Sequence, residues 1–370
     1  MSSLVLHVVT TPSGGGAQFI ARNLAKLPSS HININHEILY FSNPRSHLFN
    51  FNESTFNLRH SRSPRAIYLL RNKFLDISRN YEKTIVHSHL TWPFYYCAIA
   101  CIGIHNIQLV YTEHNTSNKR RNFPFFRIID RFFYSRYTRI ISISKSTQLH
   151  LFNWLGLSYC PADNNVRFSV IPNGARSFSN LNITKNFTRR PLNLISIGTL
   201  NYKKGFDNAI LAIKKIEDYV EKYYILGDGP MRFKLQNLIN RLELQDCIKL
   251  LGHVDQLHEF LANIDLGLVP SRVEGFGLCA IEMLSAGIPL VCTNVPGISE
   301  VLNDASAVRM TEGISSEALA EGLLYGYNNL AFREDISFSA IAFSRKYSVE
   351  KMRTAYNSVY LDLLGYSHLK

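Results

Sequence analysis

Two carboxylates lie in one short segment that has the residue types of a polar ligand site. The segment runs Pro270-Ser-Arg-Val-Glu-Gly-Phe-Gly-Leu-Cys-Ala-Ile-Glu282, and its pattern predicts a strand end, a glycine turn and a helix that begins near Phe276. Glu274 then stands in the loop, and Glu282 lies more than one turn inside the helix. The backbone N–H groups of Gly275, Phe276 and Gly277 become free donors for phosphate or sugar hydroxyls. An ordinary helix start with a favourable acidic residue is the alternative interpretation.

Positive charge stands at the start of another predicted helix. Lys203 and Lys204 come directly before a helix expected from Gly205 to Ile216. An ammonium group and the free N–H groups of a helix start can together hold a diphosphate. A solvated basic turn explains the two lysines without any ligand.

The first half of the chain offers weaker candidates. Gly14, Gly15 and Gly16 follow the first predicted strand and precede a helix, so backbone N–H groups can approach a phosphate there. The run is neither a G-x-G-x-x-G fingerprint nor a Walker loop, and a tight turn is the alternative. His114 falls at the end of a predicted strand, beside Glu113. A lone histidine at such a position is more often structural than catalytic.

The sequence indicates neither a metal nor another cofactor. It contains no D-x-D triplet, and we find no cluster of histidines and carboxylates with metal-ligand spacing. Lys204 and the helix dipoles would then neutralise the negative charge of a ligand, as a divalent ion does in other proteins. The cysteines show no C-x-x-C pairing, which favours a reducing cytoplasm over a disulfide scaffold. They are Cys97, Cys101, Cys160, Cys247, Cys279 and Cys292.

Alternating strands and helices must position these groups. At 370 residues the chain exceeds what one hydrophobic core usually supports, so two domains are expected. In the first half, short β-branched runs alternate with helical patterns, which predicts a parallel sheet wrapped by helices. The expected strands are Leu4 to Val9, His36 to Tyr40, Ile85 to Ser88, Gln108 to Thr112, Ile140 to Ile143 and Phe168 to Ile171. The expected helices are Ala17 to Leu27, Pro64 to Arg79, Pro93 to Ile102, Pro124 to Tyr137 and Ser146 to Leu155.

A second series of the same kind follows a polar stretch, Asn180 to Arg190, that is typical of a linker. Its expected strands are Leu192 to Ile197, Lys222 to Leu226, Ile248 to Leu250, Leu266 to Val269 and Leu290 to Cys292. We therefore predict an α/β protein with two Rossmann-like, doubly wound domains, residues 1–185 and 186–348, and a C-terminal helix within residues 349–370 that packs back on the first. Ligands of such sheets bind beyond the carboxyl ends of the strands, which places a cleft between the domains.

The positive charge is concentrated in the first half. Residues 1–185 carry 21 Lys and Arg against 7 Asp and Glu, whereas residues 186–370 carry 19 against 21. Nucleic acid, an anionic membrane leaflet and a phosphorylated acceptor are candidate partners for such a surface. No RNA-binding module is recognisable, so nucleic acid is not expected.

Basic and aromatic residues are interleaved from Asn118 to Lys145, a segment that includes Arg120, Arg121 and Arg127. One interpretation is a helix with an apolar core face and a solvated basic face. The other is a surface that rests on anionic lipid. The apolar N-terminal run lacks the basic residues of a signal peptide, and the longest apolar stretch is too short to span a bilayer. We expect a cytoplasmic protein. If the basic surface binds lipid, the protein is peripheral on the inner face of the cytoplasmic membrane.

Taken together, the motifs resemble those of the retaining glycosyltransferases of family 4, which have the GT-B fold and include enzymes of bacterial surface-polysaccharide biosynthesis. The match centres on Glu274-Gly-Phe-Gly-x-x-x-x-Glu282 and on the runs Met-Leu-Ser-Ala-Gly-Ile-Pro-Leu-Val and Pro-Gly-Ile-Ser-Glu after it. Further motifs follow the family's order along nearly the whole chain: Gly14-Gly-Gly, Thr112-Glu-His-Asn115, Ile143-Ser-Lys145, Ile171-Pro-Asn-Gly174, Lys204-Gly-Phe-Asp207 and Leu226-Gly-Asp-Gly-Pro230.

The resemblance implies that residues 186–348 bind a nucleotide-diphosphate sugar and that residues 1–185 face the acceptor. In the family the first glutamate lies beside the transferred sugar and the second binds the ribose hydroxyls, and these roles fall to Glu274 and Glu282. Lys204 matches the lysine that neutralises the leaving group, and His114 matches a histidine close to the reacting sugar. The rest of the implied donor site comprises Gly15, Gly16, Lys203, Gly275, Phe276, Gly277 and Leu278.

The implied reaction moves a hexose or N-acetylhexosamine from a UDP- or GDP-sugar to an acceptor hydroxyl with retention at the anomeric carbon. The implied acceptor is a lipid-linked saccharide or polysaccharide of the kind used in lipopolysaccharide or capsule assembly. Thr199 departs from the family, in which arginine often follows the preceding glycine, so one expected positive charge is missing. A nucleotide-sugar epimerase of the same fold and a catalytically silent nucleotide-sugar-binding partner are the rival functions.

Overall fold

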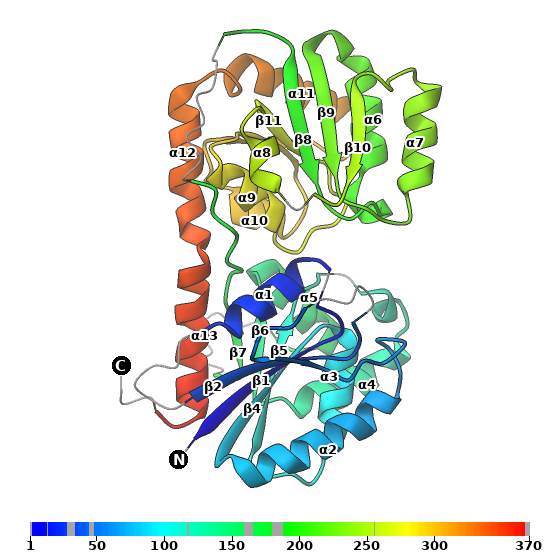
Figure 1. Cartoon of the computed structure of the whole chain (residues 1–370). Coiled ribbons are helices and arrows are strands. Elements are labelled where there is room, and N and C mark those ends of the chain that lie inside the picture. The colour runs from blue at the N-terminus through cyan, green and yellow to red at the C-terminus, as the bar shows by residue number, and fades with distance from the viewer. Residues whose placement is uncertain are drawn as a thin grey trace. The chain divides into compact units, whose positions relative to one another are not determined.

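The computed structural model describes residues 2–12, 14–27, 34–43, 48–116, 118–158, 166–179, 188–254 and 256–366 (Figure 1). The chain divides into two compact units: Met1–Gly174 with Val349–Lys370 form the first unit, and Ala175–Ser348 form the second. The change from one unit to the other thus falls after residue 174, ahead of the expected boundary at residue 185. Cys160 and most of the expected linker lie outside the described residues.

The first unit is built on a seven-stranded sheet in the order β3-β2-β1-β4-β5-β6-β7. All neighbouring strands in it run parallel. Its strands are β1 (Ser3–Val9), β2 (Ile34–Tyr40), β3 (Glu53–Thr55), β4 (Lys83–His89), β5 (Ile107–Glu113), β6 (Arg139–Ser142) and β7 (Phe168–Val170). Its helices are α1 (Gly16–Leu24), α2 (Arg65–Asn80), α3 (Thr91–Ala100), α4 (Phe125–Ser135), α5 (Lys145–Leu155) and α13 (Val349–Leu363), with a 3₁₀ turn at Lys119–Asn122.

The second unit repeats this plan with a six-stranded parallel sheet in the order β10-β9-β8-β11-β12-β13. Its strands are β8 (Leu192–Ile197), β9 (Val220–Leu226), β10 (Ile248–Gly252), β11 (Leu266–Val269), β12 (Leu290–Thr293) and β13 (Val308–Thr311). Its helices are α6 (Phe206–Lys215), α7 (Arg232–Arg241), α8 (Leu257–Leu261), α9 (Leu278–Ser285), α10 (Ile298–Leu302), α11 (Ser316–Asn329) and α12 (Glu334–Ser344). Short 3₁₀ turns lie at Tyr202–Lys204, Glu217–Tyr219 and Arg345–Tyr347. Two doubly wound α/β units are thereby confirmed.

Burial explains why the central strands were visible in the sequence and two edge strands were not. Every residue of β1 is buried, because helices cover both faces of a parallel sheet. Such strands are recognisable as continuous apolar runs. The edge strands β3 (Glu-Ser-Thr) and β13 (Val-Arg-Met-Thr) are short and contain polar residues, so their sequences lack that signal.

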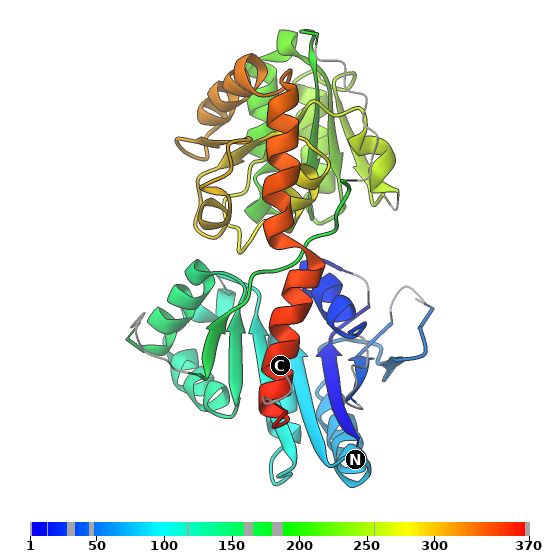
Figure 2. The ribbon, with the colours of Figure 1, turned by 90° about the vertical axis from the view of Figure 1, so that its left-hand side faces the viewer.

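The two faces of β1 carry different layers. Leu4, Leu6 and Val8 join a hydrophobic core with α2 and α3. His7 points to the opposite face, since successive strand residues alternate, and there it meets Tyr360 of α13. Figure 2 shows α13, in red, lying in front of the strands of the first sheet. A buried polar layer therefore lies between this helix and the sheet.

Helix α4 turns polar residues inward and apolar residues outward. Its buried residues are Asp130 and Tyr134. Phe125, Ile128 and Phe132 are 69%, 71% and 59% exposed. The inward position of Asp130 follows from its buried partners, because Arg120 Nε and Trp154 Nε1 donate to its carboxylate at 3.0 and 2.7 Å.

Two arginines of the basic segment are largely buried, whereas the sequence analysis had expected them to be surface charges. Arg120 pairs with Asp130, and Arg121 pairs with Glu113 at 2.6 Å, and the arginine side chains are only 10% and 9% exposed. Each guanidinium is drawn inward because a buried carboxylate needs a charged partner. Arg127 and Arg131 remain exposed on α4.

Candidate functional site

In both sheets the strand order reverses at one point, and candidate residues gather there. The reversal lies between β1 and β4 in the first unit and between β8 and β11 in the second. Connections leave such neighbouring strands in opposite directions, so the carboxyl ends of these strands stay uncovered and can bind ligands. His89 ends β4, and the segments around Lys204 and Glu274 follow β8 and β11.

In the second unit two predicted site residues are in direct contact. The Lys204 Nζ donates to Glu274 Oε2 at 2.5 Å, and Ser271 Oγ donates to the same oxygen at 3.3 Å. The stem of Lys204 passes over Gly198, where a Cβ would lie 3.3 Å from Lys204 Cε. Glycine at this position therefore leaves room for the lysine to reach the carboxylate.

The Lys204–Glu274 contact keeps both groups charged. Burial by itself lowers the pKa of Lys204, but the charge of Glu274 and its hydrogen bond raise that pKa above its ordinary value. Burial likewise acts to raise the pKa of Glu274, and Lys204 reverses this and holds it below its ordinary value. The site thus contains a half-buried ion pair at neutral pH.

Further contacts hold the two loops together. The backbone N–H groups of Arg272 and Val273 donate to the Lys203 carbonyl at 2.7 and 3.2 Å. The Arg272 guanidinium makes two hydrogen bonds to Asp207, at 2.6 and 2.9 Å. Gly205 has a φ of +67°, and a Cβ there would collide with the Pro270 carbonyl oxygen. These residues fix Lys204 opposite Glu274, and sequence reasoning did not identify Arg272.

The start of α9 presents unused backbone donors. The helix begins at Leu278, and among the described residues we find no acceptor for the N–H groups of Phe276, Gly277 and Leu278. The Gly275 N–H donates to the Glu274 carboxylate at 3.3 Å. The Phe276 side chain is buried, so only its backbone can contact a ligand. The free donors therefore lie one residue later than the sequence analysis expected.

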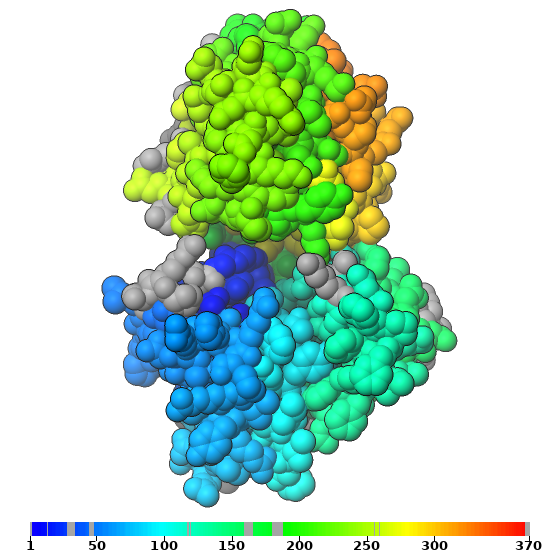
Figure 3. Space-filling view, turned by 90° about the vertical axis from the view of Figure 1, so that its right-hand side faces the viewer, coloured from blue at the N-terminus to red at the C-terminus, as the bar shows by residue number. Residues whose placement is uncertain are grey.

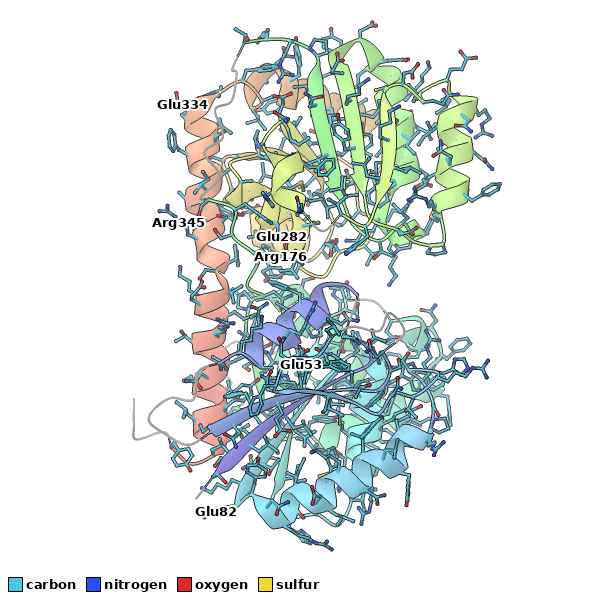
Figure 4. The ribbon with its side chains drawn as sticks, in the orientation of Figure 1. Glu53, Glu82, Arg176, Glu282, Glu334 and Arg345 are labelled. Atoms are coloured by element: carbon cyan, nitrogen blue, oxygen red, sulfur yellow. The ribbon has the colours of Figure 1, made fainter. Side chains whose placement is uncertain are left out.

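Glu282 lies in α9 beside a basic residue that sequence reasoning missed. Arg176 Nε lies 3.5 Å from Glu282 Oε1, and Figure 4 shows the two side chains next to each other. Burial raises the pKa of Glu282 to about 7, and Arg176 offsets this only in part. This carboxylate is therefore poised between its protonated and charged forms near neutral pH.

Where the family often has arginine, this loop has Thr199, and Lys203 is the replacement that the sequence offers. Thr199 is exposed, and the side chain of Lys203 is exposed too. The guanidinium of Arg272 is held by Asp207 and lies over the Tyr202 ring, 4.3 Å from its centroid. Lys204 is the cation that contacts Glu274.

In the first unit the glycine run forms the start of α1. Gly15 caps the helix in an extended conformation, and Gly16 is its first residue. A Cβ on Gly15 would have nothing within 4 Å, whereas one on Gly14 would collide with Gln18. The space beside Gly15 is therefore open, and a phosphate contact at Gly15 and Gly16 stays a prediction.

His114 follows β5 and is in contact with a second histidine. Its Nε2 lies 3.3 Å from His89 Nδ1. Burial lowers the pKa of His114 to about 4, although the nearby Glu113 acts to raise it. Glu113, the neighbouring residue and the other group here that could contact a sugar, is buried and accepts hydrogen bonds from Arg121 and from Tyr134, both at 2.6 Å. Glu113 is thus committed to structural contacts, and His114 is the better candidate.

The structure gathers three buried histidines where the sequence analysis found no cluster. Single ring nitrogens of His7, His87 and His89 lie within 4.8 Å of one another. The signal in the sequence was the spacing of His87 and His89, which puts both on one face of a strand. His7 pairs with His87 across the neighbouring strands.

Family comparisons divide the chain in the same way as the fold. The family described as "Glycosyltransferase Family 4" matches residues 13–176, and the family described as "Glycosyl transferases group 1" matches residues 182–341. An O-antigen biosynthesis glycosyltransferase, WclY, of Escherichia coli is 29% identical over 168 residues, which cover 45% of this chain and 46% of that protein. The N-acetyl-alpha-D-glucosaminyl L-malate synthase of Bacillus anthracis is 29% identical over 180 residues, 46% and 45% of the two chains. The chain thus spans about half the length of the curated relatives it matches.

Solved structures show the same fold at low identity. Anabaena Alr3699/HepE, in complex with UDP and glucose, superposes with a TM-score of 0.76 at 19% identity and covers 96% of this chain and 98% of its own. A glycosyltransferase from Rickettsia africae gives a TM-score of 0.74 at 16% identity, with 98% and 99% coverage.

Glu282→Gln tests the environment of the second glutamate. In the unfolded chain its carboxyl ionises near pH 4.5, and in the folded chain near pH 7. Between these values the folded state holds the extra proton, so stability falls as pH rises and the full penalty is present above about pH 7. The variant should therefore be more stable than the parent at pH 8 and equal to it at pH 4. Thermal unfolding across this range checks it, with exposed Glu312→Gln as control.

Lys204→Met tests the ion pair. The change leaves the Glu274 carboxylate buried without its cation, which should cost about 3–5 kcal/mol of unfolding free energy. Lys204→Met/Glu274→Gln removes both charges and should recover most of that loss in urea unfolding. Lys214→Met, which breaks an exposed pair with Glu217, should change stability little. Additive losses in the double variant would contradict a direct interaction.

Proposed function

Because the chain belongs to the GT-B glycosyltransferases of family 4 type, we propose that it moves a hexose or N-acetylhexosamine from a UDP- or GDP-sugar to an acceptor hydroxyl with retention. The observation that carries this proposal is the second unit's combination of Lys204, Glu274 and the free N–H groups at the start of α9. An ammonium and backbone donors suit a diphosphate, and carboxylates suit sugar hydroxyls. The UDP complexes of a structural neighbour support the nucleotide class.

The ion pair suggests how the donor is received. The diphosphate oxygens compete with Glu274 for Lys204, so donor binding exchanges one anion for another at the ammonium. Glu274 is then free to accept hydrogen bonds from the sugar beside it. Glu282 binds the ribose diol in its charged form, and a bound diol lowers its pKa because hydrogen bonds favour the carboxylate.

Transfer proceeds as a substitution on one face of the sugar. The bond between the anomeric carbon and the phosphate oxygen breaks, the acceptor oxygen bonds to that carbon, and the leaving phosphate takes the acceptor proton. Lys204 and the dipole of α9 stabilise the charge that develops on the phosphate. His114 contacts the donor sugar and orients it. Because Thr199 replaces the family's arginine, this chain relies more heavily on Lys204 and backbone dipoles.

The acceptor is a lipid-linked saccharide of surface-polysaccharide assembly, such as lipopolysaccharide or capsule. The similarity to an O-antigen glycosyltransferase supports this class. The outward face of α4 supports a place at the inner leaflet, since it joins exposed Phe125, Ile128 and Phe132 to exposed Arg127 and Arg131. In Figure 3 the teal part of the first unit, which includes α4, is exposed on the face toward the viewer. Among the described helices, none is long and apolar enough to cross a membrane.

The reaction is tested with purified full-length protein, a panel of nucleotide sugars and a lipid-linked saccharide. We expect acceptor-dependent release of a nucleoside diphosphate that EDTA leaves unchanged, because the charge is supplied by Lys204. The Lys204→Met/Glu274→Gln variant should fold but lose on the order of a hundredfold or more in turnover. An isomerised donor formed without acceptor would instead identify an epimerase, and loss of activity in EDTA would disprove metal independence.

Membrane docking is tested by sedimentation with liposomes that contain anionic lipid. Each basic residue near such a surface contributes about 1 kcal/mol, so Arg127→Glu/Arg131→Glu should weaken binding at least about tenfold. Lys234→Glu/Arg241→Glu makes the same charge change on the second unit and should leave binding intact. High salt should release the parent protein. If the parent ignores these liposomes at low salt, the basic surface attracts a soluble phosphorylated acceptor instead.

A further inference from the structure

We propose that His7 and His89 form a hydrogen-bonded chain that makes His114 a hydrogen-bond donor through its Nδ1 rather than a base. The inference rests on the proposed function, which assigns His114 to the donor sugar. His7 and His89 are then positioning residues, since they act through a third residue.

The hydrogen-bonded chain of the three histidines is continuous in the structure. His7 Nδ1 lies 3.3 Å from His89 Nε2, and His89 Nδ1 lies 3.3 Å from His114 Nε2. The rings come from within β1, from the last residue of β4 and from the residue after β5, so three neighbouring strands supply them. His7 and His89 are fully buried. The link between His7 and His89 therefore lies in a setting without competing water.

Neutral rings give such a chain a single direction. Burial lowers the pKa of His7 and His89 well below its ordinary value, and that of His114 to about 4. A neutral imidazole has one N–H donor and one bare acceptor nitrogen. If one ring donates toward His114, all the rings must do so. The tautomer of His114 is thus coupled to that of His7, which it does not touch.

The buried end of the chain decides the direction. His7 Nε2 has no hydrogen-bond partner among the described residues. An orphaned buried N–H group is rarer in proteins than an under-used acceptor. His7 therefore carries its proton on Nδ1 and donates to His89, and His89 donates from Nδ1 to His114.

This direction leaves the His114 proton on Nδ1. No described residue is hydrogen-bonded to that nitrogen, so it can donate to an oxygen of a bound sugar. In this tautomer Nδ1 has no lone pair to accept the acceptor's proton. His114 therefore orients the sugar, and the leaving phosphate removes the proton.

The third clustered histidine lies outside the chain. His87 Nδ1 is hydrogen-bonded to Tyr360 at 2.7 Å, and His87 Nε2 to Thr112 at 2.8 Å. Thr112 is in turn hydrogen-bonded to Tyr356 at 3.1 Å. A metal ion shared by His7, His87 and His89 would need nitrogens that these bonds already use.

Nitrogen-15 spectroscopy of the full chain, with labelled histidine, tests the direction without any substrate. We expect the signals of a protonated Nδ1 and a bare Nε2 for His7, His89 and His114. The reverse pattern, or a charged ring at neutral pH, would overturn the proposal. Because no activity is measured, failure here is distinct from failure of the proposed glycosyl transfer.

A matched pair of variants tests the coupling. The amide of His7→Asn can replace the Nδ1–H donor, so this variant should keep the His114 tautomer and the donor-sugar KM. His7→Leu cannot donate, and should leave His114 as a mixture of tautomers and raise that KM severalfold. His36→Leu removes a neighbouring buried ring outside the chain and should alter neither quantity. Equal effects of the leucine and asparagine variants at position 7 would refute the coupling.

A cobalt titration excludes the competing use of these rings. If the histidines are hydrogen-bonded to one another, adding Co²⁺ to the protein should produce no visible absorption band of a bound Co²⁺ ion. One equivalent of bound Co²⁺ that His7→Leu or His7→Asn abolishes would overturn the proposal, because the ring nitrogens would then hold a metal rather than one another. If His7→Leu fails to fold, the parent spectrum and His7→Asn still decide the question.

Discussion

The contact between the Lys204 ammonium and the Glu274 carboxylate organises the second unit's site. Burial disfavours each charge alone, so the charged form of each residue depends on the other for its stability. The surrounding loops hold this pair in place, because Gly205 approaches Pro270 closely and Arg272 is hydrogen-bonded to Asp207. The free N–H groups at the start of α9 follow Glu274 in the sequence. In the proposed function, a diphosphate takes over the partner role of Glu274 at the Lys204 ammonium.

The same reversal of strand order gives the two units different chemistry. The second unit places a cation, carboxylates and free backbone donors at this point, groups that can bind anions and hydroxyls. The first unit places histidines there that burial keeps neutral. The fold supplies the location in both cases, while the residues at the strand ends supply the specificity.

Buried polar groups also set the orientation of the helices in the first unit. Asp130 draws Arg120 and Trp154 inward and so rotates the apolar residues of α4 toward solvent. Tyr356 and Tyr360 attach α13 to the strands through Thr112 and His87. The exposed apolar residues of α4 are therefore a consequence of a satisfied interior.

Local patterns determined much of this protein. Continuous apolar runs revealed the central strands because both faces of a parallel sheet are buried, and the resemblance of the motifs to the family's marked Lys204, Glu274, Glu282 and His114 as candidates. The tertiary structure decided the rest. His7 and His89 are 82 residues apart and meet only because β1 pairs with β4. Helical periodicity located the apolar face of α4, but buried carboxylates at Asp130 and Glu113 determined which face turned inward and drew in Arg120 and Arg121. Contacts of this kind depend on which strands and loops become neighbours, and no local pattern encodes that.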